Sequence, residues 1–310
     1  MPDMRPTAPV QPRRRIRRRR IALSCATFLT LAAAGVAGPA IARSQPVSCP
    51  RATATTVVAA GIPYVDWAEN LGYDAQGNLW VSRLYRNEVQ RYDRAGRITA
   101  TVTVPSPGAI RLGPDRLLYV VYGDNSTNLL PGVHDSGVVR FDPTAVAPRP
   151  ETFVRGLTMA NGAAFDAAGN LYVADTGSGV VRVRRDATID TAWTAQTKVF
   201  GVNGLAVDGD SVYTTVYLTG QGRILRIPIA APSRSYPVAG LGLADDLAVG
   251  PGGFLYVATT SGHLVRVDPG GHGTCTLLTA GPMAAVATDS RGDLMVATGR
   301  GDVLRVQLDG

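Results

Sequence analysis

Four residues of this 310-residue sequence carry side-chain oxygens and open equivalent segments of a repeated pattern: Glu69, Asn161, Asn203 and Asp245. Two carboxylates and two amide oxygens suit a hard divalent cation such as Ca²⁺, with water completing about six to eight contacts. No histidine or cysteine stands at these places, which disfavours softer metals. If the fold brings these four opening residues together, they predict a calcium site or another polar-ligand site.

Each opening residue taken alone also has a structural interpretation. Asn-Gly, as in Asn161-Gly162, is a common turn signal, and Asp or Asn before a strand often only caps backbone groups. The register is open at Asp245-Asp246. Counting ten residues back from the leucine of the following segment, the spacing of the copies that begin at residues 69 and 161, selects Asp245.

The pattern around these residues recurs six times, with copies that begin at residues 69, 108, 161, 203, 245 and 284. Each copy resembles two strands joined by a tight turn, and a third strand follows it. Most copies continue into a fourth apolar segment, at residues 98–104, 151–154, 198–200, 236–239 and 274–278. Such units of about forty residues are typical of four-stranded propeller blades. We therefore expect an all-β, six-bladed β-propeller whose first strands line a central channel, with the opening residues at one mouth.

The last blade requires a strand from the other end of the chain. The sixth copy reaches Gly310 without a fourth strand, whereas an apolar segment at residues 52–60 precedes the first copy. Pairing this segment with the last blade would close the ring and remove exposed sheet edges. Cys49 and Cys275 would then lie on neighbouring outer strands. They form a candidate disulfide, and two separate buried thiols are the alternative.

The second unit is longer than the others because of a polar, glycine-rich segment at residues 122–136. This composition predicts a loop insertion. We expect it on the face where the first strands begin, where it could act as a lid. Its His134 is a conceivable acid–base group, although a lone loop histidine is more often a bystander.

Residues 1–42 have the pattern of a secretory signal: an arginine cluster, an apolar run and a small-residue end at Ala42. An uncleaved membrane anchor is the alternative. The segment holds eight of the 31 basic and one of the 24 acidic residues, so the remainder carries 23 of each. A neutral domain has no electrostatic footprint for nucleic acid or an anionic membrane. We expect an exported protein with one domain at 43–310, monomeric and acting on a small molecule.

The chain resembles the SMP-30/gluconolactonase/LRE-like six-bladed propellers over about residues 62–310. The resemblance implies that Glu69, Asn203 and Asp245 hold a divalent metal and that Asn161 faces the substrate. Two places depart from that family's pattern. Asn70-Leu71 follows the glutamate where Gly-Pro is usual, and Met159 stands where many sugar-lactone hydrolases carry an arginine. The second departure weakens the case for a sugar lactone.

The resemblance implies hydrolysis of a lactone or ester. The cation, most simply Ca²⁺, would polarise the carbonyl as a Lewis acid, and Asp245 would take the proton of the attacking water. Two alternatives remain. One is a non-catalytic propeller that binds a ligand or protein and has a structural cation. The other is a strictosidine-synthase-like or streptogramin-lyase-like enzyme on the same scaffold.

Overall fold

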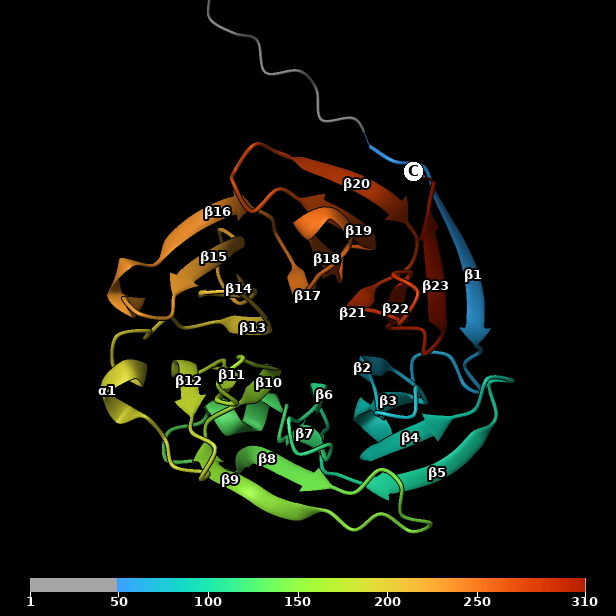
Figure 1. Ribbon diagram of the computed structural model, residues 1–310, viewed down its shortest axis with the longest axis horizontal. Helices are drawn as coiled ribbons and strands as arrows, with labels where there is room; N and C mark the ends of the chain where they lie inside the picture. Colours follow the sequence, from blue (N-terminus) through green and yellow to red (C-terminus); the bar gives the residue numbers. More distant parts are fainter. Residues whose placement is uncertain (1–48, 310) are drawn as a thin grey trace, which may run out of the picture. The chain divides into compact units, whose positions relative to one another are not determined.

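The computed structural model describes residues 49–309, which form six antiparallel sheets arranged in a ring (Figure 1). The prediction of an all-β, six-bladed β-propeller is confirmed. The proposed signal segment, residues 1–42, lies outside the described residues. Within residues 49–309, no helix combines the length and the apolar character needed to span a bilayer.

The blades follow one another along the chain, and each begins with its innermost strand. Blade 1 contains β2 (Ala68–Tyr73), β3 (Leu79–Arg83), β4 (Glu88–Tyr92) and β5 (Ile98–Thr103). Blade 2 contains β6 (Ile110–Leu112), β7 (Leu118–Tyr122), β8 (Ser136–Phe141) and β9 (Glu151–Leu157). Blade 3 contains β10 (Ala160–Phe165), β11 (Leu171–Asp175) and β12 (Gly179–Val183). Blade 4 contains β13 (Val202–Asp208), β14 (Ser211–Val216), β15 (Arg223–Pro228) and β16 (Tyr236–Gly240). Blade 5 contains β17 (Ala244–Val249), β18 (Leu255–Thr259), β19 (His263–Val267) and β20 (Thr274–Thr279). Blade 6 contains β21 (Met283–Thr288), β22 (Leu294–Thr298), β23 (Val303–Leu308) and β1 (Ala52–Val58). The short helices are η1 (Leu84–Arg86), η2 (Ser126–Leu129), α1 (Thr191–Thr194), η3 (Pro232–Arg234) and η4 (Pro251–Gly253).

The second strand of each blade is buried along almost its whole length, on both of its faces. In β11, Leu171 and Val173 belong to the apolar cluster shared with blade 2, whereas Tyr172 and Ala174 belong to the cluster shared with blade 4. Successive side chains of a strand point to opposite faces, so one strand serves two neighbours. The core of the ring therefore lies between its blades.

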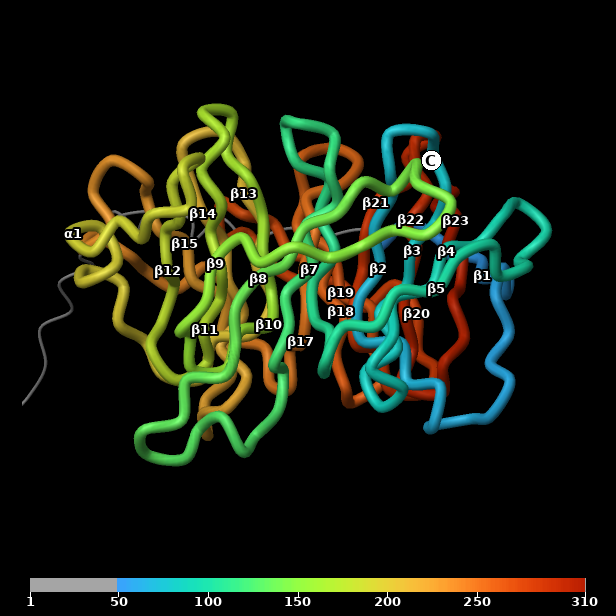
Figure 2. The backbone as a smooth tube through the Cα atoms, turned by 90° about the horizontal axis from the view of Figure 1, so that it is seen from below, coloured from blue at the N-terminus to red at the C-terminus, as the bar shows by residue number. Residues whose placement is uncertain are grey.

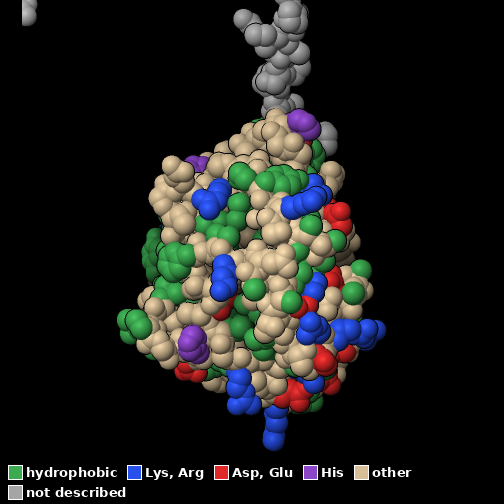
Figure 3. Space-filling view, turned by 90° about the vertical axis from the view of Figure 1, so that its left-hand side faces the viewer, with side chains coloured by type: hydrophobic (Ala, Val, Ile, Leu, Met, Phe, Trp, Pro, Cys, Tyr) green, Lys and Arg blue, Asp and Glu red, His purple; other side chains and the backbone are tan. Residues whose placement is uncertain are grey.

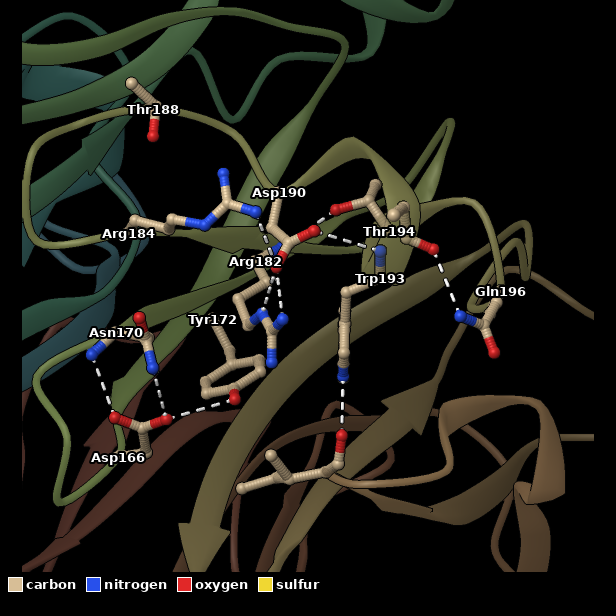
Figure 4. A network of polar contacts seen from close by, with 12 residues as sticks. Asp166, Asn170, Tyr172, Arg182, Arg184, Thr188, Asp190, Trp193, Thr194 and Gln196 are labelled. Carbon is tan, nitrogen blue, oxygen red and sulfur yellow. Dashed lines mark hydrogen bonds and ion pairs between the residues drawn. The ribbon is translucent and has the colours of Figure 1, made fainter.

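The third blade departs from the expected four strands. Residues 198–200, expected as its outer strand, are not in a strand, and the chain forms α1 instead. The Asp190 carboxylate caps α1 by accepting from the Trp193 backbone N–H at 3.1 Å, and it also pairs with Arg182 (Figure 4). Trp193 packs edge-on against Tyr172, with ring centroids 5.1 Å apart, and its indole N–H donates to the Ile229 carbonyl. The buried indole belongs to the apolar cluster between blades 3 and 4, while Ile189 and Thr197 bond to the outer edge of β12.

The two ends of the described chain share blade 6. Its strand order is β1-β23-β22-β21, and β1 pairs antiparallel with β23. Cys49, which precedes β1, forms a disulfide with Cys275 of β20, with Cα atoms 5.8 Å apart. The disulfide therefore fastens the segment before β1 to blade 5.

Glycines after two opening residues allow the inner strands to approach closely. A Cβ at Gly162 would lie 2.4 Å from the Asn203 carbonyl oxygen, and one at Gly204 would lie 2.4 Å from the Asp246 Cα. Both glycines lie inside strands, in β10 and β13. The Asn-Gly pairs therefore mark close packing between blades and not turns.

The insertion at residues 122–136 (green) and the segment that leads into β2 (blue) project from the same face of the ring (Figure 2). This is the face where the first strands begin, as expected. On the side of the ring that lies to the left in Figure 1, basic and acidic side chains are scattered among apolar ones (Figure 3).

Replacing both cysteines by serine should lower the free energy of unfolding by about 2–5 kcal/mol, because the cross-link spans 226 residues and restricts the unfolded chain. Urea unfolding measures this difference. Reduction of the wild-type protein should reproduce the value of the variant. Equal unfolding midpoints for the oxidised protein and the variant would contradict this role.

Gly204→Ala should lower the free energy of unfolding by about 1–3 kcal/mol, because the added methyl group collides with the backbone of β17. Gly240→Ala is the matched control, since a Cβ there meets nothing within 4 Å. The control should stay within about 0.5 kcal/mol of wild type. Similar losses in the two variants would show that close packing at Gly204 is not required.

Candidate metal centre

Each of the four opening residues is the second residue of an inner strand: Glu69 in β2, Asn161 in β10, Asn203 in β13 and Asp245 in β17. All four are almost fully buried. The residue before each is a fully buried apolar side chain: Ala68, Ala160, Val202 and Ala244. The alignment of the sequence copies therefore holds in three dimensions.

A β-bulge coincides with each opening residue. The pairing of the first and second strands shifts between Ala68 and Asn70, between Ala160 and Ala163, between Val202 and Leu205, and between Ala244 and Leu247. A bulge leaves a residue out of the regular ladder and re-aims its side chain, and bulges are common beside active sites. At these bulges, the side chains of the opening residues do not have to follow the regular alternation between the two faces of the sheet.

Side-chain hydroxyls fix the backbone at these bulges. Thr215 Oγ1 donates to the Asp245 carbonyl at 2.7 Å and accepts from the Gly204 N–H at 2.8 Å. In the same way, Thr176 Oγ1 donates to the Val202 carbonyl at 2.8 Å. Each hydroxyl joins the second strand of one blade, or its end, to a first strand.

Asn161 connects two carboxylates. Its Nδ2 donates to Glu69 Oε1 at 3.1 Å and to Asp124 Oδ2 at 2.8 Å. Trp67 Nε1 donates to the other oxygen of Glu69, Oε2, at 2.7 Å. Both amide hydrogens of Asn161 are thus committed, which leaves its Oδ1 as an acceptor or ligand.

Asp245 and Asp246, although adjacent, belong to different groups. Asp246 Oδ2 accepts from Asn70 Nδ2 at 2.9 Å and lies 3.6 Å from the Arg111 guanidinium. The charges acting on Asp245 come from Glu69, Asp124 and Asp246, and all are negative. Asp246 therefore has a cationic neighbour, and Asp245 belongs with the opening residues, as the spacing selected.

Burial raises the pKa of three carboxyls at this end of the axis. The pKa of Asp245 lies well above its ordinary value because of burial and then the charges of Glu69, Asp124 and Asp246. Burial and the Glu69 charge raise the pKa of Asp124 in the same way. The pKa of Glu69 is also raised, since burial outweighs the hydrogen bonds from Asn161 and Trp67. The centre thus holds negative charge that its own side chains do not neutralise.

Within residues 49–309, the buried Asn203 Oδ1 atom lacks a hydrogen-bond partner. A buried polar atom without a partner indicates an ion or water that completes the group. Carboxylates alone do not form a metal site, because within residues 49–309 no three Asp, Glu, His or Cys side chains gather closely enough to hold a metal. A cation site here would need amide oxygens as well, and Asn203 Oδ1 is available as such a ligand. The donor set fits a hard cation.

Sequence reasoning missed Asp124 and Trp67. Asp124 lies in the predicted insertion, at the start of the loop, and Asn128 fixes this loop by donating to the Gly123 carbonyl at 2.8 Å. Its polar composition indicated the loop but not which carboxylate would reach Asn161. His134, considered as an acid–base group, is exposed on the same loop. His263 and His272 bond within blade 5 and its hairpin.

A separate apolar cavity of about 300 Å³ lies between the inner strands. Leu71, Ile110, Leu205 and Leu247 line it, together with Arg111. The four opening residues do not contribute to its walls. This cavity is therefore distinct from the carboxylate group.

In the absence of divalent cations, Asp245→Asn should raise the melting temperature at pH 7–8 by about 3 °C or more, which is roughly 1 kcal/mol for a domain of this size. A carboxyl whose pKa is raised on folding binds more protons in the folded state, so it destabilises the protein as the pH rises above its unfolded pKa near 4. The gain should therefore shrink toward pH 4. Thermal melts in chelator measure this, and a gain independent of pH would contradict the assignment.

No family model and no curated protein sequence matches this chain. Solved structures share its fold. A gluconolactonase from Xanthomonas campestris is 15% identical with a TM-score of 0.65, covering 87% of this chain and 99% of its own. The PQQ-bound aldose sugar dehydrogenase from Streptomyces coelicolor is 18% identical with a TM-score of 0.64, covering 84% and 100%. A streptogramin B lyase is 9% identical with a TM-score of 0.57, covering 83% and 98%. The chain thus has the propeller fold of gluconolactonases, a fold that other enzymes share.

Proposed function

We propose that this protein is a divalent-cation-dependent hydrolase of lactones or related esters. The observation that carries the proposal is the group of buried oxygen ligands at one end of the axis, where Glu69, Asp124 and Asp245 lie without a cationic partner of their own. Such buried charge is costly unless a cation compensates it. The gluconolactonase fold provides a precedent for lactones as substrates.

Glu69, Asn203 and Asp245 would hold the cation, and Ca²⁺ fits best because every donor is oxygen. A bound cation supplies Lewis-acid polarisation of the substrate carbonyl. The Asn203 Oδ1 atom, which is buried without a hydrogen-bond partner, is suited to bind the cation. The second strands and their hydroxyls keep these donors in place.

Asp245 would act as the general base. It accepts a proton from the attacking water, whose oxygen forms a bond to the carbonyl carbon. The ring carbon–oxygen bond then breaks, and the proton passes to the departing oxygen to give a hydroxy acid.

Asn161 would orient the substrate through Oδ1. Its Nδ2 donates both hydrogens to Glu69 and Asp124, so only the accepting Oδ1 is left for a substrate. A hydroxyl of the substrate or the attacking water is a suitable donor to this oxygen. Asp124, brought by the insertion, fixes the amide in this orientation.

The protein would act outside the cytoplasm as a monomer on small molecules. The proposal rests on the signal-like residues 1–42 and on the Cys49–Cys275 disulfide, since disulfides persist in oxidising compartments. The neutral charge of the remaining chain gives nucleic acids and anionic membranes no electrostatic attraction.

Purified protein should contain bound calcium, and its melting temperature should rise on adding Ca²⁺ after chelation. Asp245→Asn should abolish the shift and lower kcat/KM on a reactive lactone by at least about 100-fold. Asp210→Asn is the matched control, because this carboxylate is exposed, with 85% side-chain exposure, and should behave as wild type.

Two results would contradict the proposal. Absence of bound cation together with no melting shift would remove the metal centre. A calcium-dependent melting shift without turnover of any lactone or ester in a broad panel would indicate a structural cation in a binding propeller.

A further inference from the structure

Exposed apolar side chains concentrate on the face that carries the candidate metal centre. Within residues 49–309, eight of the twelve exposed large apolar side chains lie in segments that lead into a first strand or join a second strand to a third: Ile62, Tyr64, Val65, Tyr85, Leu130, Phe200, Leu218 and Leu243. The other four, Ile98, Leu112, Val146 and Tyr236, lie toward the opposite ends of the strands. Exposed apolar side chains are therefore more frequent on the face of the candidate metal centre than on the opposite face.

Among the aromatic side chains on this face, Trp67 bonds directly to Glu69, and Tyr85 packs against Trp67. The Trp67 indole donates to Glu69 Oε2 at 2.7 Å and contacts Tyr85 edge-on, with ring centroids 6.0 Å apart. Tyr85 is 62% exposed, and its pKa is raised by burial and by the charges of Glu69 and Asp124. The Tyr64 ring lies 5.9 Å from the Arg300 guanidinium, next to Gly299, which packs against Trp67. We call Tyr64, Trp67 and Tyr85 the aromatic rim.

The charges on this face disfavour anionic ligands. Glu69, Asp124 and Asp245 make the centre acidic. The nearby cations are already engaged, since Arg86 pairs with Asp66 and Arg300 lies against Tyr64 and 4.0 Å from Asp302. Without a bound cation these carboxylates would repel a carboxylated or phosphorylated substrate, and Arg86 and Arg300 are already paired.

We propose that the aromatic rim is a subsite for an aryl or alkyl substituent, so that the preferred substrate is a neutral lactone or ester with an apolar group and not a sugar lactone. This inference rests on the proposed function. The carbonyl would face the carboxylate group, and the substituent would pack on Tyr85 and Trp67 beside Glu69. Aromatic surface of this kind binds apolar groups but gives polyhydroxylated rings few hydrogen bonds.

The test compares γ-butyrolactone, γ-phenyl-γ-butyrolactone and glucono-δ-lactone as substrates of the calcium-loaded protein. The phenyl compound should have a kcat/KM at least about 10-fold above that of the unsubstituted ring, and the sugar lactone should be the poorest substrate. Tyr85→Ala should lower the phenyl-to-unsubstituted ratio by about 10-fold, mainly through KM. Tyr236→Ala, an exposed tyrosine far from the rim, should leave the ratio unchanged. An unchanged ratio in Tyr85→Ala, or preference for the sugar lactone, would overturn the inference.

Two binding measurements separate this inference from the proposed function. Calorimetry with 3-phenylcyclopentanone, which cannot be hydrolysed, tests the rim even if no lactone is turned over. Binding that weakens about 10-fold in Tyr85→Ala supports the subsite, and equal binding by both proteins overturns it. Cosedimentation with phosphatidylcholine vesicles that is lost in Tyr85→Ala would overturn it as well, because the face would then dock on membranes.

Discussion

Buried negative charge at one end of the ring is the constraint to which the rest of the structure responds. Glu69, Asp124 and Asp245 are shielded from water and act on one another. The Arg111 guanidinium pairs with Asp246 and donates to Asn70, so its charge is directed to Asp246. Carboxylates in this state either bind protons or require a cation, because isolated buried charge is strongly unfavourable. The six-bladed scaffold supplies the stability that keeps these groups together.

Local features of the backbone hold the opening residues in place. Each opening residue lies at a bulge. The hydroxyls of Thr215 and Thr176 bond to the carbonyls of Asp245 and Val202, and two glycines let adjacent inner strands approach. Regular alternation would force a residue at this position to one face of its sheet. The bulges direct polar side chains toward the axis while the apolar residues on either side remain in the core. Fold and site are thus built by the same local features.

Much of this arrangement could be predicted from the sequence. Six copies with a common spacing identified the blades, and the same spacing placed Glu69 and Asp245 at equivalent strand positions. Asp124 could not be predicted, because its contact with Asn161 spans 37 residues and depends on the path of a loop. The third blade was predicted wrongly at residues 198–200, since a short apolar segment does not reveal that the chain forms α1 and bonds to β12 through Ile189 and Thr197. Bulges have no sequence signal of their own.

The central claim is that the opening residues form one cation site. A crystal structure of the protein grown with Mn²⁺ as an anomalous scatterer tests it most directly. We predict one strong anomalous peak on the central axis, bound by side-chain oxygens of Glu69, Asn203 and Asp245. Absence of a peak there, with these side chains unchanged and the axis occupied by water, would contradict the account.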